Sequence, residues 1–307
     1  MEQFSLERTI DPFAVRVDVP VRGGRLHVAQ AGPPPGAARA VVLAAHGVTA
    51  SLMTWRTLAR LIPEDVCLLA PDLRGRGRSA ELPGPYGIAA HIDDLLAVLD
   101  HAGVRSAILL GHSMGAYVVA RLAAEHPDRV AALILLDAGL PLEPPADVER
   151  TIETSVASSI ARLSIAFPSA EHYVDGWRGH PAFARAWNDD VDAYARYDVA
   201  EREGGARCTA SLTAVRTDSE EMVRDQDTRR ALDRVRCPVH LLRAERGLFN
   251  DADDPLIATK ALRSFAAAHP SMRVDAVADV NHYTIVMGDG PGAPHVAAAI
   301  AAAAAAG

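Results

Sequence analysis

The stretch AILLGHSMGAYVVARLAAE, residues 107–125, decides the fold. Its beginning is apolar throughout, as in a strand of a parallel sheet that is covered on both faces. Residues 115–125 then follow a helical pattern that stops before Pro127. The link is GHSMG at residues 111–115, which matches G-x-S-x-G. We expect Ser113 to lie on a sharp, strained turn at the start of a helix, where aligned N–H groups favour negative charge.

Strand and helix signals alternate on both sides of this stretch. Strands are predicted at 13–19, 25–31, 40–45, 66–70, 130–136, 238–244 and 272–278, and those at 40–45 and 66–70 are continuous apolar runs. Amphipathic or alanine-rich segments predict helices at 52–61, 88–102, 259–268 and 294–306. The first two strands, with Gly23-Gly24 between them, read as a hairpin. Strands that alternate with helices indicate βαβ units and a doubly wound, mostly parallel sheet.

The alternation is interrupted between about residues 144 and 230. This part has helical segments and many aromatic residues but no strong strand. A helical insertion within an α/β sheet is typical of a lid over an active site. We therefore predict a core domain made of residues 1–140 and 231–307, and a helical cap made of residues 141–230.

Other motifs follow the expected strands in a fixed order. His46-Gly47 comes after the third strand, PDLRGRGRS (residues 71–79) after the fourth, and GHSMG after the fifth. The insertion follows the sixth strand, and Asn281-His282 follows the last. In this order and spacing, over nearly its whole length, the chain resembles the α/β-hydrolase family. The resemblance implies that fold, with a mostly parallel, doubly wound sheet and a helical cap insertion, and a serine-dependent hydrolase activity.

The resemblance also implies a role for individual residues. Ser113 would be the nucleophile, and His282 the general base that takes its proton and later returns it to the leaving group. The backbone N–H groups of Val48 and Met114 would form the oxyanion hole. His46 would shape the loop that carries Val48. His112 is interpreted as only the variable residue of the turn.

The acid that orients His282 is open to more than one assignment. Most members of the family carry it after the seventh strand, but Gly247 stands at that place here. Some carry it at the end of the sixth strand, where Asp137 ends an apolar run and a buried carboxylate needs a hydrogen-bond partner. We predict a hydrogen bond of roughly 2.6–3.2 Å between Asp137 and His282. The alternatives, all near the seventh strand, are Asp251, Glu245, Asp253 and Asp254.

The expected reaction is hydrolysis of a small carboxylic ester or lactone through an acyl-enzyme. Four aromatic residues are candidates for an apolar substrate wall: Trp55, Tyr173, Trp177 and Trp187. Amide and carbon–carbon bond hydrolysis use the same triad and stay open. Epoxide and haloalkane hydrolysis usually need an aspartate nucleophile in this fold, so Ser113 argues against both. A non-catalytic small-molecule receptor can also keep the triad.

Two further patterns favour structural interpretations. Residues 75–80 match the dinucleotide fingerprint G-x-G-x-x-A, but Pro83-Gly84-Pro85 prevents the helix that such a site requires. Two pairs have metal-like spacing without a third ligand and are interpreted as surface helix residues, namely His91 with Asp94 and His172 with Asp175. The predicted reaction needs neither a metal ion nor an organic cofactor.

Composition limits the class of partner. The net charge of −8 gives no general attraction to nucleic acid or to anionic membranes. Three scattered cysteines give no disulfide framework, and we see neither a signal peptide nor an apolar segment long enough to span a bilayer. We expect a cytoplasmic protein with a small-molecule substrate. The oligomeric state is not predicted.

Overall fold

A single eight-stranded sheet forms the centre of the computed structural model, which describes residues 11–141, 146–147, 149–150, 157 and 161–306. The strand order is β1-β2-β4-β3-β5-β6-β9-β10. The β1–β2 and β2–β4 pairs are antiparallel, and all other neighbours in the sheet are parallel. The strands are β1 (Val15–Val21), β2 (Gly24–Ala31), β3 (Ala40–Ala45), β4 (Val66–Pro71), β5 (Ala107–His112), β6 (Val130–Leu136), β9 (Val239–Arg246) and β10 (Arg273–Asn281). The predicted mostly parallel sheet is confirmed.

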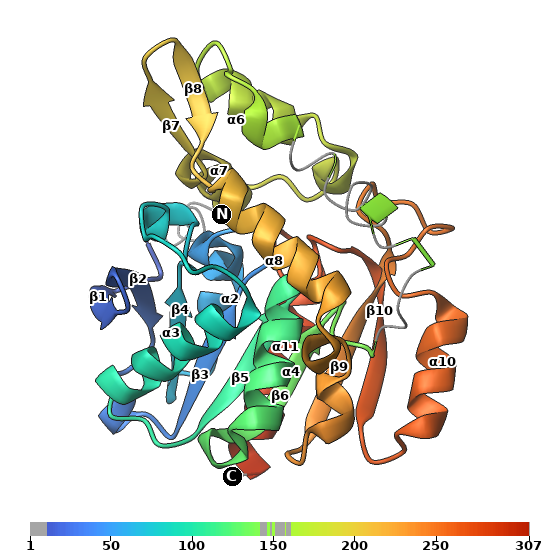
Figure 1. Cartoon of the computed structure of the whole chain (residues 1–307). Helices are drawn as coiled ribbons and strands as arrows, with labels where there is room; N and C mark the ends of the chain where they lie inside the picture. Colours follow the sequence, from blue (N-terminus) through green and yellow to red (C-terminus); the bar gives the residue numbers. More distant parts are fainter. Residues whose placement is uncertain (1–10, 142–145, 148, 151–156, 158–160, 307) are drawn as a thin grey trace, which may run out of the picture.

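Helices cover both faces of this sheet (Figure 1). One face packs against α3, α4, η6 and α10, and the other packs against α2 and α11. The core helices are α2 (Arg56–Ala59), α3 (Ile88–His101), α4 (Met114–Glu125), α10 (Thr259–Ala268) and α11 (Gly292–Ala306). Short 3-10 turns are η1 (Pro35–Ala37), η2 (Leu52–Trp55), η3 (Gly77–Ser79), η4 (Pro127–Arg129) and η6 (Ala231–Arg234).

The continuous apolar runs are explained by this double cover. Along β3, Val42 and Ala44 face one buried cluster, whereas Val41, Leu43 and Ala45 face the other. Successive side chains of a strand point to opposite faces, so a strand covered on both faces must be apolar at every position. The alanine-rich segment near the end of the chain is α11, which buries one face on the sheet and is therefore not simply a surface helix.

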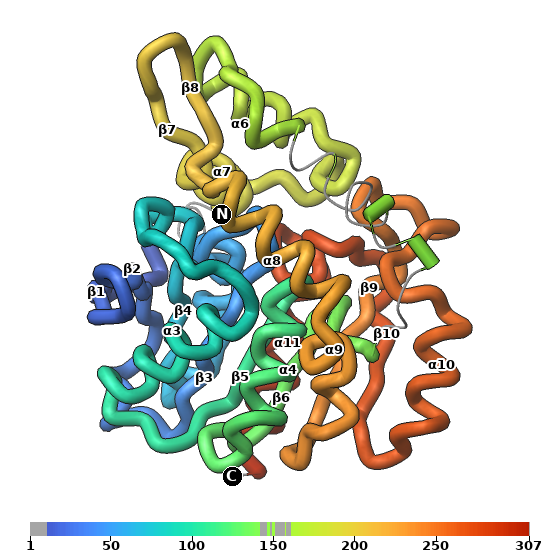
Figure 2. The backbone as a smooth tube through the Cα atoms, viewed as in Figure 1, coloured from blue at the N-terminus to red at the C-terminus, as the bar shows by residue number. Residues whose placement is uncertain are grey.

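The segment predicted as a cap lies mostly beyond one end of the sheet, and its described part is called the cap below (Figures 1 and 2). Its elements are α6 (Ala170–Arg178), η5 (Pro181–Phe183), α7 (Asp189–Tyr197), β7 (Val199–Arg202), β8 (Gly205–Cys208), α8 (Leu212–Arg224) and α9 (Gln226–Arg229). The last two reach down to the core, where α8 contacts α3 and α9 contacts α4. The predicted helical segment also contains two short strands, because β7 and β8 form an antiparallel hairpin. Both strands are too short to give a clear alternation. The sequence feature that could have indicated them is Gly204-Gly205, where the chain turns into β8 and both residues have positive φ angles, 80° and 123°.

The cap is anchored to the core by polar contacts as well as by apolar packing. Tyr197 on α7 donates to the Asp72 carboxylate at 2.6 Å. Asp190, also on α7, accepts from Arg56 Nε at 2.8 Å. The apolar cluster on the α11 face of the sheet continues into the cap without a break. None of the helices in the described ranges combines the length and the apolarity that crossing a membrane requires.

Candidate active site

The predicted strand–turn–helix around Ser113 is present and is sterically demanding. Ser113 joins β5 to α4 with φ 56° and ψ −123°, a region that side-chain-bearing residues rarely occupy. A Cβ at Gly115 would lie 1.9 Å from the Ala45 carbonyl oxygen, and one at Gly111 would lie 2.5 Å from the Gly115 oxygen. The two glycines are therefore required because backbone approaches backbone here. Ser113 itself is only half-buried at this edge.

His282 and Asp137 meet at the same edge of the sheet. His282 follows β10, and its Nδ1 lies 2.8 Å from Asp137 Oδ2, within the predicted range. The predicted hydrogen bond is therefore confirmed. Asp137 is fully buried, and its other oxygen accepts from Ala244 N at 3.1 Å. The carboxylate thus has a partner on each oxygen, which offsets the cost of burying it. Among the described residues, no hydrogen bond joins His282 to Ser113, and such contacts often tighten only when substrate binds.

The alternative acids do not reach His282. Asp251 is exposed, and its carboxylate accepts from Asp253 N at 2.8 Å within its own turn. Glu245, Asp253 and Asp254 are exposed as well. Gly247 has a steric reason of its own, because a Cβ there would lie 1.9 Å from the Asp254 carbonyl oxygen. The turn after β9 therefore has no room for the aspartate that most members of the family carry.

The loop that carries Val48 is held against the nucleophile. A Cβ at Gly47 would lie 3.2 Å from Ser113 Cβ and 3.7 Å from its Oγ. His46 is fully buried, accepts from Leu73 N at 3.0 Å through Nε2, and donates to the Gly47 oxygen at 2.8 Å through Nδ1. Burial lowers the pKa of His46 to about 3, so its ring is neutral and both contacts keep their roles.

The two expected oxyanion donors are free to act. In the described part of the chain, neither Val48 N–H nor Met114 N–H donates to a protein acceptor. Met114 opens α4, so its N–H has no partner within the helix. Val48 lies in the loop next to Gly47, which contacts Ser113. The assignment of both N–H groups to the oxyanion hole stays a prediction.

His112 has a role that sequence reasoning missed. It is buried, and its Nε2 donates to the backbone oxygen of His282 at 2.7 Å. The two imidazole rings lie 4.5 Å apart between centroids. Burial, and then the neighbouring His282, lower the pKa of His112 well below its ordinary value, so it is neutral. No sequence signal distinguishes this histidine from any other residue at the variable position of G-x-S-x-G.

Asn281 fixes the turn on which His282 stands. Its Oδ1 accepts from Tyr283 N and Thr284 N, both at 3.0 Å. Its Nδ2 donates to the Ala182 oxygen in the cap at 2.8 Å. The loop that carries His282 is therefore held from within and from the cap.

The aromatic candidates lie at different depths. Trp55 is fully buried in the core and Tyr173 nearly so, and their assignment to a substrate wall stays a prediction. The Tyr173 hydroxyl donates to buried Asp198. Trp187 is half-buried beneath the Arg178 guanidinium, 5.2 Å from its ring centroid. Trp177 is buried too, but its ring lies 5.7 Å from that of Tyr283, the neighbour of His282.

The dinucleotide-like run and the two His/Asp pairs have the following surroundings. Residues 75–80 contain the short turn η3, and a Cβ at Gly77 would lie 2.3 Å from the Asp72 carboxyl carbon, so this run wraps a buried carboxylate. His91 and Asp94 were wrongly expected on the surface, since both are fully buried. His91 Nε2 lies 3.0 Å from Asp218 Oδ2, and Asp94 Oδ1 lies 2.6 Å from Arg74 Nη2. His172 and Asp175 are exposed as expected. Within the described ranges, no group of three or more His, Cys, Asp or Glu side chains could hold a metal ion.

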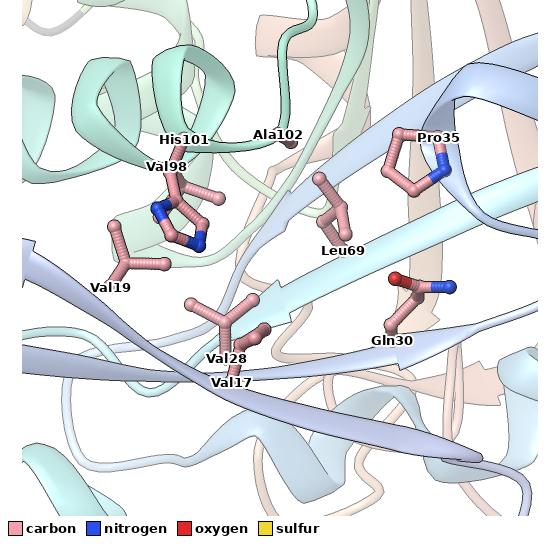
Figure 3. A pocket seen from close by; sticks show the side chains of 9 residues that line it. All are labelled: Val17, Val19, Val28, Gln30, Pro35, Leu69, Val98, His101 and Ala102. Atoms are coloured by element: carbon pink, nitrogen blue, oxygen red, sulfur yellow. The ribbon is translucent and has the colours of Figure 1, made fainter.

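A separate pocket of about 260 Å³ lies between the N-terminal hairpin and α3 (Figure 3). It is lined by Val17, Val19, Val28, Gln30, Pro35, Leu69, Val98, His101 and Ala102. None of the residues assigned to catalysis is among them. The pocket is mostly apolar and has no place in the chemistry of Ser113.

Comparison with known proteins identifies the fold. A sequence model of the α/β hydrolase fold matches residues 40–164, which include the Val48 loop, Ser113 and Asp137. The solved structure of E-2-(acetamidomethylene)succinate hydrolase superposes with a TM-score of 0.74 over 94% of this chain and 98% of that one, at 22% identity. The chain therefore has the α/β-hydrolase fold.

Two curated proteins from Mycobacterium tuberculosis are similar over part of the chain. Lipase LipV is 45% identical over 118 residues, which are 38% of this chain and 43% of the lipase. Epoxide hydrolase A is 39% identical over 136 residues, which are 43% of this chain and 41% of that enzyme. The match thus spans less than half the length of either relative.

Proposed function

We propose that the chain is a serine hydrolase that cleaves a carboxylic ester or lactone of a small substrate. The observation that carries the proposal is the 2.8 Å hydrogen bond between Asp137 and His282, at the sheet edge where Ser113 occupies its strained turn. These residues come from three different strand ends. A purely structural histidine has no need of a fully buried carboxylate on one ring nitrogen beside a half-buried serine.

The residues act in a definite sequence in this proposal. His282 takes the proton from Ser113 Oγ as the oxygen attacks the substrate carbonyl carbon. The N–H groups of Val48 and Met114 hold the negative oxygen that forms, and buried Asp137 stabilises the imidazolium. The C–O bond to the leaving group then breaks, and His282 returns the proton to the alcohol oxygen. Water, activated by the same imidazole, attacks the acyl-enzyme and releases the acid and free Ser113.

Two further observations favour this chemistry. The lipase named above is a hydrolase of esters by name, and its similarity to this chain supports the same reaction class. The similarity to an epoxide hydrolase does not extend the proposal to epoxides, because Ser113 stands where this fold usually carries an aspartate for that reaction. The Trp177–Tyr283 contact next to His282 supports an apolar acyl or ring group on the substrate.

Turnover of a short-chain p-nitrophenyl ester, together with labelling by a fluorophosphonate, tests the proposal. Ser113→Ala is expected to lose label and several orders of magnitude in kcat, as triad nucleophiles do. Ser271→Ala, a change at an exposed serine before β10, is the matched control and should behave as wild type. If Ser113→Ala retained more than about a tenth of the activity, Ser113 would not be the nucleophile. Ligand binding by wild type without turnover or labelling would favour a receptor.

A further inference from the structure

Arg76 is a fully buried arginine that the proposed catalysis does not use. It is the middle arginine of the run at residues 71–79. Burying a guanidinium is expensive unless the charge is paired and its N–H groups are hydrogen-bonded. The partners that offset this cost therefore show what the side chain is for.

The partners of Arg76 lie on two different parts of the molecule. Its Nε donates to the Val48 carbonyl oxygen at 2.9 Å, and its Nη1 donates to the Arg74 oxygen at 2.9 Å. Nη1 also forms an ion pair with Asp218, a fully buried residue of the cap helix α8. In Figure 1, α8 runs from the cap toward the core helices. One guanidinium thus joins the oxyanion loop to the cap.

Asp218 is itself held on both oxygens by the core. Its Oδ1 accepts from Gly87 N at 2.7 Å, and its Oδ2 lies 3.0 Å from His91 Nε2 on α3. Burial opposes its ionisation, but His91 and Arg76 outweigh that effect and hold the pKa of Asp218 well below its usual range. Asp218 is therefore a fixed anion that sets the direction of the Arg76 side chain.

The contact with Val48 matters because of peptide geometry. The Gly47 carbonyl and the Val48 N–H belong to one planar trans peptide and point in opposite directions. His46 fixes that peptide through the Gly47 oxygen at 2.8 Å. Arg76 fixes the next peptide through the Val48 oxygen. Val48 is therefore held on both sides, which leaves its N–H little freedom to turn.

We propose that Arg76 is a positioning residue that couples cap helix α8 to the oxyanion hole. Asp218 orients the guanidinium, and the guanidinium holds the Val48 carbonyl so that the Val48 N–H points at the developing oxyanion. The cap then acts in catalysis itself, in addition to covering the site. The inference rests on the proposed function, in which Val48 N–H is an oxyanion donor.

Arg76→Lys tests the proposal against a matched control. The lysine keeps a positive charge beside Asp218, but an ammonium lacks the planar fork that holds Asp218 and Val48 together. Arg74→Lys is the control, because Arg74 forms an equally buried ion pair with Asp94 and donates to the Arg22 and Pro83 oxygens, away from Val48. Both variants should lose similar amounts of thermal stability.

The two variants are expected to differ in turnover. Removing an oxyanion donor typically lowers kcat by 10²–10³, so a donor that is kept but badly aimed should lower it by about 10-fold with KM unchanged. Arg74→Lys should keep kcat within about twofold of wild type. The proposal is overturned if Arg76→Lys keeps wild-type kcat, or if Arg74→Lys loses as much. Should Arg76→Lys fail to fold, the pair replacement Arg76→Met with Asp218→Asn takes its place, because the asparagine oxygen can still accept from Gly87 N and no buried charge is left unpaired.

A second measurement separates failure of this inference from failure of the proposed function. Amide hydrogen exchange of the peptide that spans residues 46–52 needs no substrate. Exchange should be faster in Arg76→Lys than in Arg74→Lys if Arg76 holds this loop. Equal exchange in the two variants overturns the coupling, whether or not wild type hydrolyses esters. If exchange is faster in Arg76→Lys but wild type shows no Ser113-dependent turnover, the coupling is supported and the proposed hydrolase activity is rejected.

Discussion

Replacing Asp137 by Asn changes one heavy atom of the candidate triad, and the side chain can then keep only one of its two accepted hydrogen bonds. The carboxylate of Asp137 faces two donors, His282 Nδ1–H at 2.8 Å and Ala244 N–H at 3.1 Å. An asparagine side chain has one acceptor oxygen and one NH₂ group, so it cannot accept from both. Asparagine also tolerates the φ of 50° at this position, so backbone strain adds nothing to the comparison.

Each orientation of the amide has its own cost. If the NH₂ group faces Ala244, two N–H donors oppose each other in a buried place, which costs about 1–3 kcal/mol. If it faces His282, the imidazole must offer Nδ1 as an acceptor and carry its proton on Nε2. That tautomer cannot take the proton of Ser113. The second orientation keeps the backbone hydrogen bond, so we expect it to dominate, and kcat to fall by about 10⁴, equivalent to roughly 5 kcal/mol.

The assay is turnover of the nitrophenyl ester by Asp137→Asn, with Asp251→Asn as the control at the competing position. Asp251 is exposed and bonds only within its own turn, so its variant should keep nearly wild-type kcat. Thermal unfolding of Asp137→Asn should stay close to that of wild type. The reasoning is refuted if Asp137→Asn keeps more than about a tenth of wild-type kcat, or if Asp251→Asn is the more damaging change.

Three further results are expected. Gly247→Asp in the Asp137→Asn background should lower Tm and fail to restore turnover, because a Cβ at Gly247 would lie 1.9 Å from the Asp254 carbonyl oxygen; recovered activity would contradict the steric argument. Ser113→Gly should unfold at a higher temperature than Ser113→Ala, because φ 56° with ψ −123° costs a residue with a Cβ about 1–3 kcal/mol, and the reverse order of Tm would show that the turn is not strained. The pKa of His46 is about 3 in the folded state and 6.5 in the unfolded state. Between these pH values the unfolded state binds one more proton than the folded state. The free energy of unfolding should therefore fall as the pH drops below 6.5, by up to about 1.4 kcal/mol per pH unit from this side chain. Urea denaturation at neutral and mildly acidic pH measures this, and an unchanged free energy of unfolding would exclude His46 as a buried neutral group.

The parallel core could be predicted because its strands carry the signal at every position. A run such as residues 107–110 is apolar on both faces, and the turn that follows it has a fixed glycine requirement. Asp137 could be placed near His282 because both end parallel strands at one edge of the sheet, and the catalytic roles of these residues remain predictions. The β7–β8 hairpin could not be found in the same way, since its pairing depends on a turn between two very short strands.

Polar residues were the harder part to place. His91 and Asp94 have the pattern of an exposed helix face, yet both are buried by partners far away in the sequence, Asp218 and Arg74. Hydrophobic periodicity predicts that a charged residue faces solvent, and it contains no information about a distant partner. For the same reason, the contact between His112 and His282 could not be predicted from the sequence. Trp55 is hard to assign from sequence for a different reason, because an aromatic residue near a loop can face either a substrate or the core, and here it is fully buried.

The pairing of β6 with β9 also bears on how the chain folds and how its relatives can diverge. Leu136 and Leu242 are partners in adjacent strands, and the entire cap is the loop that their pairing closes. The entropy of closing a loop grows only logarithmically, by about 0.6 kcal/mol for each doubling of length, so an ancestor could lengthen or shorten this insertion at little thermodynamic expense. The folding rate is more sensitive to the length of this insertion than the stability is, because contacts between residues far apart in the sequence form slowly. The strands up to β6 can therefore assemble first, with β9 and β10 joining the sheet in a late step. The features expected to change least among relatives are then cap side chains that reach the core, such as Asp190, Tyr197, Asp218 and Glu221, rather than the length of the chain between them.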